Sequence, residues 1–167
     1  MEIRKVKFSD VEQMTAIYNF YIENTLVTFE EEAITAEEMH SRVEKVIQQH
    51  LPWLVIENEE GDLLGYAYAD SWHTRRCYRF TVEPSVYLLP EVKGQGYGTI
   101  LFDALLLLLR QSEIRNVLGV IALPNEASVA MHEAHGFEKV GEFSDVGFKF
   151  EQWVSVGYWQ LKLEHSE

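Results

Sequence analysis

The 167-residue chain has one cysteine, Cys77, and four prolines. A single cysteine excludes a disulfide framework within the chain and any metal site built from several thiolates. Arg75 and Arg76 are neighbours of the kind that lower a thiol pKa, but a lone cysteine in a strand-like segment is more often a small buried residue. We therefore expect a structural role for Cys77.

Basic residues are also scarce, with 14 Lys and Arg against 27 Asp and Glu and a formal net charge of -13. This balance disfavours nucleic acid and anionic membranes as partners, although it leaves room for a local basic pocket. Of the six histidines only His132 and His135 are close in sequence, and no third ligand accompanies them at a recognisable spacing. No metal site is predicted.

Long hydrophobic runs are absent as well. The longest apolar run, residues 104–109, is far shorter than the roughly 20 residues that span a membrane, and the first residues carry no apolar signal segment. Hydrophobic residues make up 47% of the chain, and no Pro/Gly/Ser-rich linker divides it. We expect one domain over residues 1–167, in a soluble cytoplasmic protein.

Alternation and helical spacing predict a mixed α/β order of about seven strands and about four helices. Strands are expected at residues 2–6, 53–57, 63–69, 78–89, 116–122, 137–143 and 154–163. Helices are expected after Ser9 and Asp10, after a Thr35 cap, from about residue 97 to 110, and at residues 126–134. Residues 144–153 are expected to form a loop, and Pro84 predicts a bulge within the fourth strand.

Three glycines at alternate positions, Gly94, Gly96 and Gly98, join the fourth strand to an apolar helix. Without side chains there, successive backbone N–H groups can converge on a phosphate at the positive end of the helix dipole. Lys93 adds a cation at the rim. The spacing fits neither a dinucleotide fingerprint nor a P-loop. Taken alone, the motif has a second, less favoured interpretation as a flexible glycine turn.

This stretch resembles the acetyl-CoA pyrophosphate loop of the GNAT superfamily of N-acetyltransferases, whose pattern is Gln/Arg-x-x-Gly-x-Gly/Ala, with Lys93 where the family has Gln or Arg. Blocks spread over nearly the whole chain are similar to the phosphinothricin and methionine sulfoximine acetyltransferase branch. They include the segments at residues 52–55, 65–69, 86–87, 123–125, 128–134 and 156–161. The resemblance implies a single-domain N-acyltransferase fold with a mixed, mostly antiparallel sheet.

The resemblance also implies how acetyl-CoA is held. The strand before the loop would lend backbone groups to the pantetheine arm, the loop would hold the pyrophosphate, and the residue that opens the next helix would contact the pantetheine. The implied residues are Val86, Tyr87, Leu88, Lys93, Gly94, Gln95, Gly96, Tyr97, Gly98, Thr99 and Asn125. Without the resemblance, Asn125 would be interpreted as an ordinary helix cap.

Acetyl transfer requires deprotonation of the amine, stabilisation of the acetyl oxygen and acceptance of the thiolate leaving group. Glu83 matches a glutamate assigned as the base in the family; the alternative is a structural or substrate-binding carboxylate. A backbone N–H near Tyr87 or Leu88 is the expected oxyanion donor, since a bulge would free it. His132 stands where the wider superfamily has a tyrosine that protonates the thiolate. The alternative interpretation is a histidine with a structural role in its helix. His135 is assigned to helix-end structure.

Arg75 matches an arginine of this branch that meets the carboxylate of a small amino acid, which a guanidinium can bind through both oxygens. Thr28, Phe29 and Trp72 are the candidate walls of the side-chain pocket, although each aromatic taken alone is more often core. The residues around Phe148 and Trp153 are expected to close this pocket or to reach a partner subunit.

The predicted function is acetyl-CoA-dependent N-acetylation, by direct transfer, of the α-amine of a glutamate-like small molecule such as phosphinothricin or methionine sulfoximine. The resemblance implies a homodimer, and resistance to a herbicide-like amino acid is either the selected role or a side activity. The alternatives are acetylation of a polyamine, an aminoglycoside or a protein N-terminus, and a non-catalytic acetyl-CoA-binding module. Arg75 argues against a cationic substrate.

Overall fold

The computed structural model describes residues 1–164, which form a seven-stranded sheet in the order β1-β2-β3-β4-β5-β7-β6. The chain divides into two compact units. Unit 1 contains residues 1–19, 34–70 and 84–113; unit 2 contains residues 20–33, 71–83 and 114–167. Helix α1 (Val11–Asn24) and strand β4 (Thr81–Leu88) contribute residues to both units.

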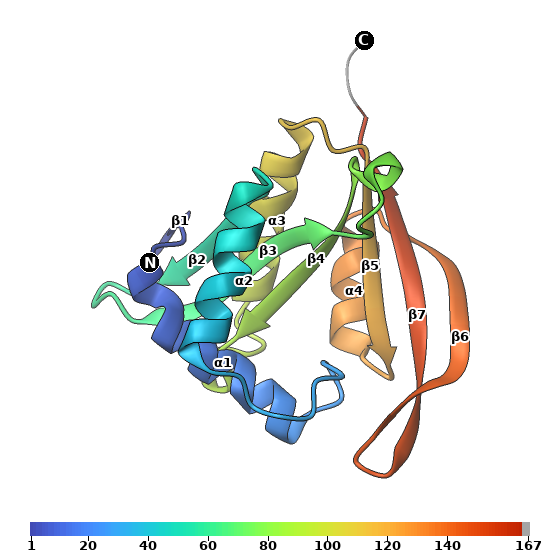
Figure 1. Ribbon diagram of the computed structural model, residues 1–167, viewed down its shortest axis with the longest axis horizontal. Coiled ribbons are helices and arrows are strands. Elements are labelled where there is room, and N and C mark those ends of the chain that lie inside the picture. Colours follow the sequence, from blue (N-terminus) through green and yellow to red (C-terminus); the bar gives the residue numbers. More distant parts are fainter. Residues whose placement is uncertain (165–167) are drawn as a thin grey trace. The chain divides into compact units, whose positions relative to one another are not determined.

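Unit 1 is built on antiparallel pairing of β1 (Glu2–Lys5), β2 (Trp53–Glu57) and β3 (Leu63–Ser71). Strand β2 packs against both α2 (Ala36–Gln48) and α3 (Tyr97–Arg110), and Figure 1 shows these helices in front of and behind the strands. Helix α3 buries one apolar face, through Leu101, Phe102, Leu105, Leu106 and Leu109. This i, i+4, i+8 spacing is the pattern that places residues on one side of a helix.

Helix starts in unit 1 follow the expected cap chemistry. Thr35 Oγ1 accepts a hydrogen bond of 3.1 Å from the Glu38 N–H, which confirms the predicted cap of α2. Before α1, a short 3-10 helix η1 (Phe8–Asp10) ends at Asp10, which accepts from the Lys7 N–H at 2.7 Å. The Arg4 guanidinium bonds both Asp10, at 2.8 Å, and Glu57, at 2.6 Å. Burial alone would raise the pKa of Asp10, but the bonds from Arg4 and Lys7 outweigh it and lower that pKa.

Unit 2 is built on β5 (Asn116–Leu123), α4 (Glu126–Ala134), β6 (Glu138–Lys149) and β7 (Gln152–Lys162). All eight residues of β5 pair antiparallel with β7, and β6 and β7 form a long hairpin. Thr81 and Val82 of β4 pair in parallel with Asn116 and Val117. Pro84, two residues further along β4, has no N–H to donate to a ladder. The bulge expected at Pro84 stays a prediction.

Three sequence-based expectations were wrong. The fourth strand begins at Thr81 rather than near Tyr78, because η2 (Arg76–Tyr78) is a 3-10 helix; Cys77 lies on it and is exposed rather than buried. Residues 144–153 are not a loop, since all but two of them continue β6 and β7. Only Phe150 and Glu151 make the turn, with φ of 51° and 57°. Positive φ at both central residues is typical of the tight turns that match strand twist.

Candidate active site

The glycine loop lies in unit 1 and leads directly into α3. The short 3-10 helix η3 (Pro90–Val92) ends β4, and the chain then turns through Gly94 and Gly96, with φ of 76° and 88°. Gly96 is the N-cap of α3, and a side chain at Gly94 or Gly96 would meet nothing within 4 Å. The first N–H groups of α3 have no partner within the helix, and the dipole places positive potential there. This arrangement is suited to a phosphate, and the role predicted for these loop residues stays a prediction.

The predicted loop residues differ in their exposure to solvent. Lys93, Gly94, Gln95, Gly96 and Thr99 are exposed, whereas Tyr97 and Gly98 are half-buried in the first turn of α3. Gln95 Nε2 donates to the Glu91 carbonyl at 3.3 Å, which folds this side chain back on the loop.

The end of β4 is fixed by close contact with β3. The Leu89 N–H donates to the Leu64 carbonyl at 2.9 Å. A Cβ on Gly65 would lie 2.6 Å from the backbone carbonyl oxygen of Tyr87, so only glycine lets the two strands approach this closely. The Tyr87 ring packs against Tyr18 and Tyr66, with centroids 5.1 and 5.5 Å apart. Val86, Tyr87 and Leu88 are half-buried. Gly65 is part of the site's support, and sequence spacing alone did not reveal it.

The remaining predicted residues lie in unit 2. Asn125 is the N-cap of α4, and its Oδ1 accepts from the Ser128 N–H at 3.1 Å. The cap interpretation is therefore confirmed. An apolar hollow of about 390 Å³ lies beside it. The hollow is lined by Leu123, Pro124, Asn125, Glu126, Val129, Ala130 and Glu133.

His132 lies in the last turn of α4 and is 6% exposed. Its Nδ1 is 2.7 Å from the Ser128 carbonyl, which can only accept, so Nδ1 carries a proton. In the neutral imidazole Nε2 is then an acceptor. Burial lowers the pKa of His132 below its usual 6.5; the Ser128 bond opposes this, and His135 adds to it. His135 is the C-cap of α4, with Nδ1 2.6 Å from the Met131 carbonyl, as expected of helix-end structure.

We expect nuclear magnetic resonance titration to give His132 a pKa below 6.5, with an Nδ1–H neutral form at pH 7. The unfolded chain then binds a proton that the folded chain does not, so this histidine lowers stability as the pH falls through the unfolded value of about 6.5. A His132 pKa above 7, or an Nε2–H tautomer, would contradict the geometry.

Glu83 lies in β4 between two buried residues, Val82 and Pro84, and is itself half-buried. Alternation along a strand directs its side chain away from the face on which its neighbours are buried. Trp72 follows β3 and is tied to the start of β4, because its N–H donates to the Thr81 carbonyl at 3.2 Å. The Trp72 ring packs edge-on against Tyr78 at 5.3 Å.

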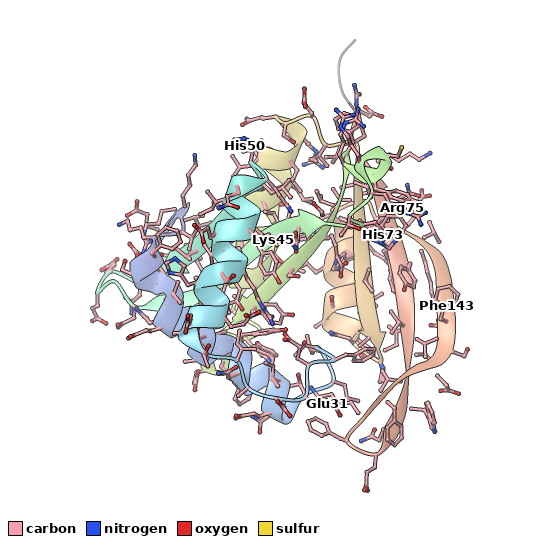
Figure 2. All side chains as sticks on the ribbon, viewed as in Figure 1. Glu31, Lys45, His50, His73, Arg75 and Phe143 are labelled. Atoms are coloured by element: carbon pink, nitrogen blue, oxygen red, sulfur yellow. The ribbon has the colours of Figure 1, made fainter. Side chains whose placement is uncertain are left out.

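Arg75 is the N-cap of η2 and is exposed. Its carbonyl accepts from the Tyr78 N–H at 2.9 Å, so its backbone is fixed while its side chain meets solvent. Figure 2 shows Arg75 and His73 near the start of β4, and Glu31 on the segment that follows α1. That segment carries Thr28, which is buried, and Phe29, a residue that is 43% exposed. The structure does not bring Arg75 next to this segment, so the two are separate candidates for substrate contact.

Among residues 1–164, no group of three or more His, Cys, Asp or Glu side chains is placed to hold a metal ion. No helix in the described part of the chain is long and apolar enough to cross a membrane.

The model of the acetyltransferase (GNAT) domain family matches residues 3–156. The chain belongs to this family. It is 37% identical to phosphinothricin N-acetyltransferase of Streptomyces viridochromogenes over 164 residues, which cover 98% of this chain and 88% of that protein. The predicted superfamily and branch are thereby confirmed.

Two solved structures are close to this fold. A GNAT superfamily phosphinothricin acetyltransferase from Sinorhizobium meliloti, in complex with acetyl-CoA, has a TM-score of 0.95 and 33% identity; the match covers 97% of this chain and 88% of that one. A ribosomal-protein-alanine N-acetyltransferase from Brucella melitensis also has a TM-score of 0.95, with 32% identity, covering 98% of this chain and 100% of that one. The fold prediction is confirmed.

Proposed function

We propose that this acetyltransferase transfers the acetyl group of acetyl-CoA to the α-amine of a small glutamate-like amino acid such as phosphinothricin or methionine sulfoximine. The observation that carries the proposal is the 37% identity to a phosphinothricin N-acetyltransferase over 98% of the chain. Arg75 supplies an exposed cation suited to the substrate carboxylate.

Acetyl-CoA binding is assigned to the residues predicted from the sequence. The N–H groups at the start of α3 hold the pyrophosphate, with Lys93 at the rim, and the backbone at Val86, Tyr87 and Leu88 meets the pantetheine arm. Asn125 keeps its Oδ1 on the helix and offers its amide nitrogen to the pantetheine.

The reaction is direct transfer. Glu83, directly or through a water molecule, takes one proton from the substrate ammonium, and the free amine attacks the acetyl carbon. The C–S bond breaks to release CoA thiolate, and the second proton of the former ammonium leaves the nitrogen and passes, through His132 or solvent, to the thiolate. A backbone N–H near Tyr87 or Leu88 stabilises the oxygen of the tetrahedral intermediate. Neutral His132 is suited to relaying a proton through Nε2, because its lowered pKa leaves it unprotonated at pH 7. It is less suited to donating a proton as an imidazolium that was already formed before the reaction.

The test of this function is thiol release from acetyl-CoA with a panel of amines. The panel contains phosphinothricin, methionine sulfoximine, ordinary amino acids, spermidine, an aminoglycoside and a peptide with N-terminal alanine. Saturable release with the first two, at far higher kcat/KM than with the others, is the expected result. Preference for spermidine or the aminoglycoside would contradict the proposed substrate class.

Replacement of Arg75 by Ala is expected to lower kcat/KM for phosphinothricin about 10- to 100-fold, mainly through KM. The reason is that a charge-assisted hydrogen bond contributes about 1.5–3 kcal/mol. Arg76→Ala is the matched control, because Arg76 is also exposed and begins the 3-10 helix that Arg75 caps. Equal losses in both variants would indicate a general effect of local charge and remove Arg75 from the substrate site.

A second candidate function is acetylation of a protein N-terminus, favoured by the similarity to the ribosomal-protein-alanine N-acetyltransferase. The net charge of -13 produces a negative electrostatic potential around the chain. This potential attracts basic ribosomal proteins at long range. The alanine peptide in the panel separates the two functions, since a peptide offers no α-carboxylate next to its amine. Retention of peptide activity in Arg75→Ala would support this second function.

We also propose that residues 1–167 act as one catalytic domain, in the cytoplasm, as a homodimer, and that resistance to a herbicide-like amino acid is one role. The support for a homodimer is a set of exposed apolar side chains on β6 and β7. Their exposed fractions are 57% for Val140, 59% for Phe143, 55% for Val146, 55% for Phe148 and 67% for Trp153. Large exposed apolar patches commonly mark contact surfaces, and these five residues are the candidates for one.

A further inference from the structure

Lys149, the last residue of β6, carries an ammonium group buried in unit 2. The residue is only 2% exposed. Its Nζ donates to the carbonyls of Ile22 at 2.8 Å, Thr25 at 2.9 Å and Thr28 at 2.8 Å. An ammonium has three N–H donors, so these three carbonyls use all of them.

The three carbonyls belong to the end of α1 and the segment after it. Ile22 is in the last turn of the helix, where carbonyls lack a donor within the helix and the dipole favours a cation. Thr25 and Thr28 lie beyond the helix, in a segment without strand or helix structure. A buried charge is costly unless it is well bonded, so the ammonium holds these carbonyls in one arrangement. Burial lowers the pKa of Lys149, while Glu31 and Glu30 oppose that shift.

A second contact joins the same two segments. Gly147 lies against the ring of Phe29, and a Cβ on Gly147 would stand 2.5 Å from Phe29 Cε2 and Cζ. The hairpin end therefore fixes the backbone as far as Thr28 and also the ring of the next residue. Figure 1 shows the segment after α1 next to the turn between β6 and β7, in agreement with these contacts.

We propose that Lys149 is a positioning residue for amine-substrate recognition, because it holds the Thr28–Phe29 wall in place from the β6–β7 hairpin. This inference rests on the proposed function, which assigns Thr28 and Phe29 to the substrate pocket. Lys149 itself touches no substrate. Its effect is transmitted through the Thr28 carbonyl and, with Gly147, through the position of the Phe29 ring.

The test compares Lys149→Met with the parent in steady-state kinetics, at a temperature where both are fully folded. Methionine keeps an unbranched apolar stem of similar reach but cannot donate to the carbonyls. We expect KM for phosphinothricin to rise about tenfold or more while KM for acetyl-CoA changes less than twofold. Lys149→Arg keeps the charge and several donors, so it should restore part of the loss.

Arg4→Met is the matched control for lost stability, because Arg4 is also a largely buried cation that bonds two partners, but in unit 1. It should lower the melting temperature and leave both KM values within twofold. Gly147→Ala is the second variant if Lys149→Met does not fold. It displaces the Phe29 ring without removing the ammonium, and the same selective rise in KM is expected.

The outcomes separate the two proposals. If the parent releases no thiol with any amine of the panel, the proposed function fails and the role of Lys149 fails with it. If the parent is active on phosphinothricin but neither Lys149→Met nor Gly147→Ala changes its KM, only the role of Lys149 is overturned. Equal rises in KM for phosphinothricin and acetyl-CoA would also overturn it, because they indicate general loosening.

Discussion

Replacing Glu83 by Gln is expected to reduce kcat for phosphinothricin at pH 7 by about 100-fold or more. A positioned general base contributes roughly 10²–10⁴ to rate, and an amide of the same shape cannot accept the ammonium proton. The side chain is half-buried in β4, whose preceding residues Thr81 and Val82 are fixed by pairing with β5. The substitution should therefore change chemistry with little change in fold.

The deficit of Glu83→Gln should shrink as the pH rises towards the pKa of the substrate amine, because the free amine then needs no base. Rate profiles from pH 6 to 10, with calorimetric titration of acetyl-CoA, measure both effects. Glu138→Gln is the control, because Glu138 is an exposed residue at the start of β6. If kcat falls less than threefold, Glu83 is a structural carboxylate. A parent without turnover, whose acetyl-CoA binding is lost in the variant, would instead support a binding module.

Local patterns were sufficient to predict most of the elements. The limits of β2 and α4 agree with the structure, and Thr35 and Asn125 make the side-chain caps that their positions suggest. Each of these features depends on residues within a few positions of one another. The glycine loop is of the same kind, because a stop at Pro90, two glycines with positive φ and a helix start follow one another directly.

The hairpin turn was missed because its chemistry is unusual. Tight turns with two residues at positive φ favour Asn and Gly, and Phe150 and Glu151 give no such signal. The start of β4 was misplaced for a similar reason, since Cys77 and Tyr78 fit a strand as well as a 3-10 helix. At the turn, the surrounding structure holds a conformation that the residues do not prefer. At η2, it selects one of two conformations that the residues allow.

Contacts between distant residues were beyond any local pattern. Lys149 bonds carbonyls 121 to 127 positions earlier in the chain, and nothing near Lys149 in sequence indicates that its ammonium is buried. Gly119 is another example, because in sequence it is a small residue in an apolar strand. In the folded chain it lies under the imidazole of His132. Such positions support a site without belonging to its motif.

Gly119→Ala is accordingly expected to lower kcat about tenfold or more. A Cβ there would lie 2.5 Å from His132 Cδ2 and 2.7 Å from Nε2, far inside contact distance. The imidazole has little room to yield, since Nδ1 is bonded to the Ser128 carbonyl and Phe137 packs against the ring at 4.9 Å. It must rotate and lose that bond, and a misplacement of about 1 Å can cost up to about 100-fold in rate. Overpacking should also reduce stability by about 1–3 kcal/mol.

Gly141→Ala is the matched control, because Gly141 lies in β6 where an added Cβ would meet nothing within 4 Å. It should retain the parent's kcat.

The double variant Gly119→Ala/His132→Ala tests whether the loss of activity in Gly119→Ala arises from displacement of the histidine. If it does, adding Gly119→Ala to His132→Ala removes no further activity, because there is no ring left to displace. A further tenfold loss in the double variant would mean that Gly119 acts through β5 itself. If kcat is unchanged in both Gly119→Ala and His132→Ala, His132 is a structural residue of α4. The thiolate would then be protonated by solvent.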